Sequence, residues 1–124
     1  GGMDRRLLHR AWALQAHARD DVAMEAEPVA GMIRRKDVIE HADARGFEWI
    51  VAKLDKAEHV CLYGGGAEWT LPIDARGFIE EMAKHPRFTA DAALAWDRRL
   101  DWNGAREFLE QLVGAGIVRV HRSP

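Results

Sequence analysis

The fold is indicated most clearly by Phe108-Leu109-Glu110-Gln111-Leu112-Val113-Gly114-Ala115-Gly116-Ile117-Val118. Up to Val113, its apolar residues recur three and four positions apart, which is the spacing of one face of an α-helix. Two glycines then favour a helix end, and the β-branched residues that follow favour a strand. The sequence therefore predicts a helix over 102–113 that turns directly into a short strand over 117–120.

Two further helices are predicted before this one. Residues 73–85 have a helical pattern of apolar residues, and Pro86 ends it because proline cannot continue a helix. Thr89 is then placed to cap a second short helix, since its hydroxyl can accept a hydrogen bond from a free backbone N–H. The C-terminal half of the chain therefore contains three short helices.

A β-hairpin is predicted upstream of the helices. The stretches 59–63 and 67–71 are rich in β-prone residues. They flank Gly64-Gly65-Gly66, and glycine readily adopts the positive φ angles of a tight hairpin turn. Three helices beside a small antiparallel sheet are the components of a winged helix-turn-helix unit, which we assign to residues 58–124.

The N-terminal half has a helical pattern. Residues 4–24 contain no Gly or Pro and many strong helix formers, and residues 25–31, with Pro28, resemble a linker. Residues 33–56 again space their apolar side chains by three, four or seven. The predicted fold class is therefore α+β and mostly helical, with an N-terminal helical extension over 3–57 that precedes the winged helix.

The composition limits the function classes. The 124 residues include 18 Lys+Arg, 20 Asp+Glu and a single Cys, which is typical of one soluble domain without disulfides. A near-neutral balance argues against a strong phosphate-driven nucleic-acid binder. No apolar run approaches the roughly 20 residues that cross a bilayer. Gly1 and Gly2 before Met3 are typical of tag removal, no signal peptide follows, and we expect no membrane association and a cytoplasmic location.

The second half resembles known winged-helix domains in its motifs. These are Trp69-Thr70-Leu71-Pro72, Phe78-Ile79, the cap Thr89, and the closing Phe-Leu-x-x-Leu-Val-x-x-Gly-Ile-Val pattern. In this order of elements it is similar to the peptide-recognition domains of ribosomal-peptide biosynthesis, and it also resembles the C-terminal winged helix of cupin-type ribosomal oxygenases. The first resemblance implies strand addition, in which a peptide pairs with a sheet edge and contacts a neighbouring helix. The edge would lie at 60–63 or 69–71.

We therefore expect a non-catalytic interaction module that binds a peptide or a partner protein and needs neither cofactor nor metal. The side chains expected to bind the partner are Tyr63 and Trp69 on the hairpin, and Trp102 and Arg106 on the last helix. The partner itself is not identified by the sequence. A homodimer through residues 4–24 is a second expectation, because an Ala-rich helix packs closely against another helix.

A DNA-binding regulator is the first alternative function. It would place Arg34, Arg35, Lys36 and Arg106 on phosphates. Residues 58–124 carry 8 basic and 10 acidic residues, and this negative balance in the half that would read DNA disfavours the alternative.

A subunit of a metal- or thiol-dependent enzyme is the second alternative. His41 and Asp43 have the His-x-Asp spacing of non-haem iron sites, but on the predicted helix these side chains would point about 200° apart. His59 and Cys61 would share one face of a strand, as a thiol and imidazole pair requires. No second ligand pair is present for zinc, and Cys61 lies between apolar residues, which is typical of a buried thiol.

Overall fold

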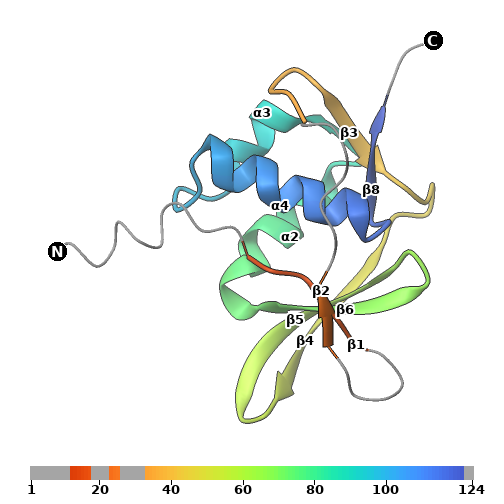
Figure 1. Cartoon of the computed structure of the whole chain (residues 1–124), viewed down its shortest axis with the longest axis vertical. Helices are drawn as coiled ribbons and strands as arrows, with labels where there is room; N and C mark the ends of the chain where they lie inside the picture. Colours follow the sequence, from red (N-terminus) through yellow and green to blue (C-terminus); the bar gives the residue numbers. More distant parts are fainter. Residues whose placement is uncertain (1–11, 18–22, 26–32, 122–124) are drawn as a thin grey trace, which may run out of the picture.

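In the computed structural model, residues 12–17, 23–25 and 33–121 are described (Figure 1). They form an α+β fold with two antiparallel sheets. The first sheet has the order β2-β1-β6-β5-β4 and consists of β1 (Gln15–His17), β2 (Ala23–Glu25), β4 (Glu48–Leu54), β5 (Ala57–Gly64) and β6 (Ala67–Pro72). The second sheet has the order β7-β3-β8 and consists of β3 (Val38–His41), β7 (Arg87–Thr89) and β8 (Val118–His121).

The helices follow the first sheet in the chain. They are the 3-10 turn η1 (Ile73–Ala75), α2 (Arg76–Lys84), α3 (Ala90–Ala93), the 3-10 turn η2 (Leu94–Trp96) and α4 (Trp102–Gly114). The predicted cap at Thr89 is confirmed, because its hydroxyl accepts a hydrogen bond from the N–H of Ala92 at 3.2 Å. Asp101 caps α4 in the same way through the N–H of Gly104 at 2.8 Å.

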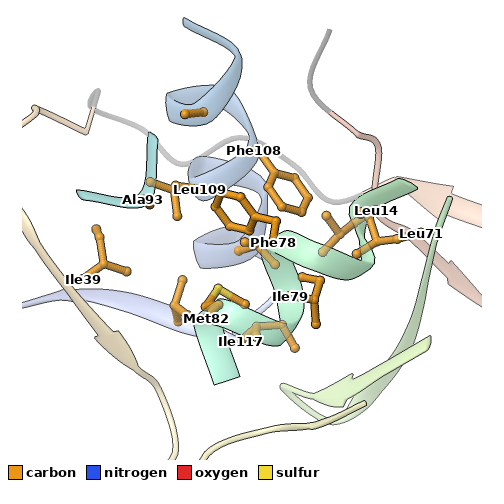
Figure 2. Close-up of a cluster of buried hydrophobic side chains, with 14 of the residues drawn as sticks. Leu14, Ile39, Leu71, Phe78, Ile79, Met82, Ala93, Phe108, Leu109 and Ile117 are labelled. Carbon is orange, nitrogen blue, oxygen red and sulfur yellow. The ribbon is translucent and has the colours of Figure 1, made fainter. Parts of the chain in front are cut away.

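One hydrophobic core joins the helices to both sheets (Figure 2). Phe78 of α2 and Phe108 of α4 are fully buried and meet edge to face, with their ring centroids 5.1 Å apart. Leu71 comes from the first sheet and Ile39 from the second, and both pack into this cluster. Because both sheets contribute to one cluster, the helices and sheets are packed as a unit.

The prediction of a mostly helical chain is wrong, and residues 33–56 show why. This range was predicted to be helical but contains β3 and β4. In β4, apolar residues occur both at helical spacing and on alternate positions, so the spacing alone favours neither structure. The pairing with β5 stabilises the strand, because every residue of β4 has a partner in β5, from Glu48 with Tyr63 to Leu54 with Ala57.

The winged helix-turn-helix with an N-terminal helical extension is corrected as well. The hairpin that was expected to form the small sheet belongs instead to the five-stranded sheet, as β5 and β6. The three-stranded sheet takes its central strand, β3, from the predicted extension. Residues 15–17 and 23–25 of that extension are also strands, and residues 1–11, 18–22 and 26–32 lie outside the described residues. The division of the chain between residues 57 and 58 stays a prediction.

The predicted glycine hairpin is confirmed, and its tip contacts the end of α4. Gly65 and Gly66 both have positive φ, +63° and +77°, as a type I′ turn requires. A Cβ atom on Gly65 would overlap the carbonyl oxygen of Ala115. Gly116 also has positive φ, +79°, and a Cβ on it would lie 3.0 Å from Cα of Gly65. The hairpin and the turn after α4 therefore touch backbone to backbone.

Candidate functional site

Strand β4 is the longer of the two edge strands of the five-stranded sheet, the other being the three-residue β2. Strand β4 pairs with β5 along all seven residues, and no strand of the described part of the chain pairs with its other side. Alternate residues of such an edge point their N–H and C=O groups away from the sheet, where they are free to bond another strand. In Figure 1 the β4–β5 hairpin extends away from the helices. A seven-residue edge of this kind is a ready template for strand addition.

Ile50 lies in the middle of this edge. It is 49% exposed and is the one large hydrophobic residue that is exposed among those the structure describes. Its register partner on β5 is Cys61, so the two side chains share the sheet face opposite the one that Leu62 presents to the core. On the core side of the same strand, Trp49 packs against the core. The β4 edge therefore presents the exposed side chain of Ile50 on one face, and on the other face the ring of Trp49, which packs against the core.

Two hollows flank the edge. One, of about 300 Å³, lies at the start of β4 and is lined by Asp43, Arg45, Phe47, Glu48, Tyr63 and Gly65, among others. The second, of about 590 Å³, is a more open hollow towards the end of the strand and is lined by Val51, Ala52, Lys53, Lys56, Glu58 and Ile73. Both hollows have room for side chains of a strand that pairs with β4.

Tyr63 is one of the four residues predicted to bind a partner, and it lines the first hollow. Its hydroxyl donates a hydrogen bond of 3.4 Å to Oε1 of Glu68. Burial and the negative charge of Glu68 raise the pKa of Tyr63 above its ordinary value. The phenol is therefore neutral at physiological pH and acts as a hydrogen-bonding group.

The other three predicted residues lie elsewhere, so the four do not form one site. Trp69 is paired with Leu62, whereas Tyr63 is paired with Glu68, which places Trp69 and Tyr63 on opposite faces of the hairpin. Trp102 and Arg106 are in the first two turns of α4. Tyr63 lies near the other end of that helix, because its hollow includes Gly116, and 13 residues of helix span about 20 Å.

The sheet edges that were expected to receive a peptide are occupied. Strand β5 lies between β4 and β6, and β6 lies between β5 and β1. The chain's own β1 pairs with β6 through Gln15 with Thr70 and Ala16 with Trp69. The edge of β6, next to α4, is therefore already occupied by a strand of the same chain, β1.

The segment before β1 is held by α4. Leu14 is fully buried, and its N–H donates a 3.0 Å hydrogen bond to Oε1 of Gln111. Nε2 of Gln111 donates in turn to the carbonyl oxygen of Trp12 at 2.9 Å. Glu110, also on α4, accepts a hydrogen bond from the N–H of Ile33. Gln111 is one of the polar residues that a DNA-reading helix would offer, and here it binds the chain itself.

The thiol and imidazole pair shares one strand, as predicted, but lacks the features of a nucleophile. Cys61 is buried, and burial followed by the charge of Glu68 raises the pKa of its thiol. A reactive cysteine needs the opposite shift, because the thiolate is the nucleophile. Nδ1–H of His59 donates to the carbonyl oxygen of Ala57 at 3.0 Å.

The His41 and Asp43 pair is held by separate backbone contacts. Nε2–H of His41 donates to the carbonyl oxygen of Met82 at 2.9 Å. Oδ1 of Asp43 accepts from the N–H of Arg45 in a tight turn. Among the residues that the structure describes, no group of three His, Cys, Asp or Glu side chains is placed to hold a metal ion.

Of the three basic residues before β3, Arg35 contacts side chains from other elements of the chain. Nη1 of Arg35 pairs with Oδ1 of Asp91 at 3.1 Å, and its guanidinium lies 5.0 Å from the ring centroid of Trp102. Arg34 and Lys36 are exposed. Arg35 therefore ties this loop to α3 and to the start of α4.

Glu40 joins the three strands of the smaller sheet. Its side chain is largely buried and accepts hydrogen bonds from Arg119 at 2.6 Å and from Arg87 at 3.2 Å, and Nδ1 of His121 lies 2.9 Å from its Oε1. Arg87 lies on β7, and Arg119 and His121 lie on β8. The hydrogen bond from Arg119 and the surrounding positive charges hold the pKa of the Glu40 carboxyl below its usual value.

Glu40→Gln is expected to reduce the pH dependence of stability. Because the folded-state pKa is lowered, ionised Glu40 stabilises the fold above its unfolded-state pKa, and this contribution is lost as pH falls through the folded-state pKa. The variant should therefore be less stable than wild type near pH 7, with the difference shrinking towards about pH 3. Urea unfolding at several pH values measures this, with the exposed Glu107→Gln as control. A gap that is constant over that range would contradict it.

Comparisons with known proteins gave no match to a family model, to a curated protein or to a solved structure. Within the described residues, no helix combines the length and the apolar character that a bilayer span requires.

Proposed function

We propose that this protein is a non-catalytic interaction module that binds an extended segment of a partner protein or peptide by adding it as a strand to β4. The open edge of β4, with the exposed Ile50 at its centre, is the observation that supports this function most directly. Main-chain hydrogen bonds to the edge would provide much of the affinity, and contacts with alternate side chains would provide the specificity.

The pattern of β4 defines the kind of segment that fits. Residues of an added strand alternate between the two faces of the sheet. On one face they would meet Ile50 and Ala52, and on the other Trp49 and Val51. A segment with apolar residues on both faces at its centre, and with side chains at its ends that reach the two hollows, matches this surface. Strand addition is also the mode implied by the resemblance noted above, although at a different strand.

Selection of peptides tests the proposal. A library of random ten-residue peptides displayed on phage would be selected against the full chain, and the enriched peptides would be titrated against variants. Ile50→Lys is expected to weaken their binding about tenfold or more, because roughly half of an isoleucine side chain is left to be buried. Ala92→Lys adds the same charge at an exposed position of α3 and should leave binding unchanged.

Nuclear magnetic resonance locates the bound peptide. On titration, the amide signals of β4 are expected to shift most, and those of α3 least. Peptides that bind wild type and Ile50→Lys equally, or that shift signals of another surface, would contradict the proposed site.

A further inference from the structure

One strand that the open β4 edge can receive is β4 of a second copy of the chain. We infer that two copies pair antiparallel through β4 and join their five-stranded sheets across a two-fold axis. This inference rests on the proposed function, because it names the partner segment of the same edge.

The sequence of β4 matches itself in the antiparallel direction. If Val51 lies opposite Val51 of the second copy, all seven residues of each strand have a partner. Ile50 then lies opposite Ala52, and this occurs twice because of the two-fold symmetry. A small residue opposite a large one leaves room for the isoleucine, and the pair buries the side chain that is 49% exposed in the single chain.

Charge favours this direction over the parallel one. In the antiparallel register, Lys53 lies opposite Trp49 of the other copy, where an ammonium group can contact an aromatic face. Glu48 lies opposite Leu54. Parallel pairing in register would instead place Glu48 beside Glu48 and Lys53 beside Lys53, and like charges directly opposite destabilise a sheet.

The surroundings of β4 leave space for the second copy. Val51 and Lys53 share the core-side face with Trp49, and beside them lies the open hollow of about 590 Å³ that also includes Ile73. The β4–β5 hairpin reaches away from the helices (Figure 1). An added strand therefore meets an open hollow beside β4 on that face.

Sedimentation of the full chain tests self-association. Over a range of about 1 to 500 μM, which brackets typical weak association, wild type is expected to shift from monomer to dimer. Ile50→Lys should raise the dissociation constant at least about tenfold, while Ala92→Lys should leave it unchanged. A monomer at every concentration would overturn the inference, and so would a dimer that Ile50→Lys does not weaken.

Cross-linking tests the register. In a Cys61→Ala background, Val51→Cys places two thiols opposite each other across the axis. Lys53→Cys places them about 13 Å apart along the strands, which is too far for a disulfide. Under mild oxidation the Val51→Cys dimer is expected to form at least about tenfold faster. Equal rates would overturn the register.

The two proposals fail in distinguishable ways. If the chain is a monomer but still binds the selected peptides at β4, only the self-pairing is overturned. If it neither dimerises nor binds peptides at β4, the proposed function is overturned as well.

Discussion

Gly65→Ala is expected to lower the free energy of unfolding by about 3 kcal/mol or more. Part of this loss, about 1 kcal/mol, arises because Gly65 has a φ of +63°, which an alanine adopts with strain. The larger part arises because the new methyl group would overlap the carbonyl oxygen of Ala115. A backbone oxygen cannot rotate away as a side chain does, so the tip of the hairpin would have to move off the end of α4.

Two other glycines provide matched controls. Gly66 has the same kind of φ, +77°, but no atom lies within 4 Å of the position of its Cβ, so Gly66→Ala should lose only about 1 kcal/mol. Gly77 lies inside α2 with open space around it, and Gly77→Ala should gain about 0.5 to 1 kcal/mol. Urea unfolding followed by tryptophan fluorescence measures all three. Equal losses for Gly65→Ala and Gly66→Ala would show that the contact with Ala115 contributes nothing.

The local patterns of residues 73–120 were sufficient to predict their helices. The proline at 86, the cap at Thr89 and the glycines after Val113 act over a few residues, and the structure has helices between these boundaries. Strand β7 was not predicted, because three residues are too few to show a period. Its partner β3 is short as well, and pairs with residues that are far away in the sequence. Short strands of this kind are specified by long-range pairing rather than by local sequence.

Strand β4 was predicted as a helix although its sequence contained a signal for the alternative. Ile50 and Val51 are β-branched, which favours a strand. The two-residue connection to β5 is Asp55-Lys56, and both residues have positive φ, 49° and 68°. Two-residue turns with positive φ at both positions usually contain Asn or Gly, so Asp55-Lys56 did not indicate a hairpin.

The candidate site depends on the order of the strands in the sheet. This order cannot be predicted from local sequence patterns, because it is set by pairing between distant segments. The hairpin of β5 and β6 was predicted, but which of its neighbours would cover it was not. Strands β1 and β4 pair with the two sides of the hairpin. The edge that we propose to bind a partner is therefore β4, with Ile50, and not a strand of the hairpin. The predicted residues Trp69 and Trp102 are both partly buried against the core, as large aromatic side chains commonly are.

Phe108→Ala is expected to lower the free energy of unfolding by about 3 to 5 kcal/mol, because it removes a fully buried ring from the centre of the core. The ring contacts Phe78 and also Trp12, whose ring centroid is 5.0 Å away at an interplanar angle of 77°. Phe47→Ala, at a partly buried position beside the first hollow, should lose less than about half as much. Chemical unfolding of the two variants measures the difference.

The contact between Phe108 and Trp12 also links the N-terminal segment to the core, and a double-mutant cycle isolates it. Trp12→Ala combined with Phe108→Ala should show a coupling of about 1 kcal/mol, the range for an edge-to-face aromatic pair. Such a coupling would mean that the rings add to the two hydrogen bonds from Gln111 in holding residues 12–14 on α4. If the two losses are simply additive, the contact between Trp12 and Phe108 contributes nothing, and the segment is held by its other contacts, such as those with Gln111. With the edge of β6 closed in this way, β4 is the longest edge strand that the described residues leave open to a partner strand.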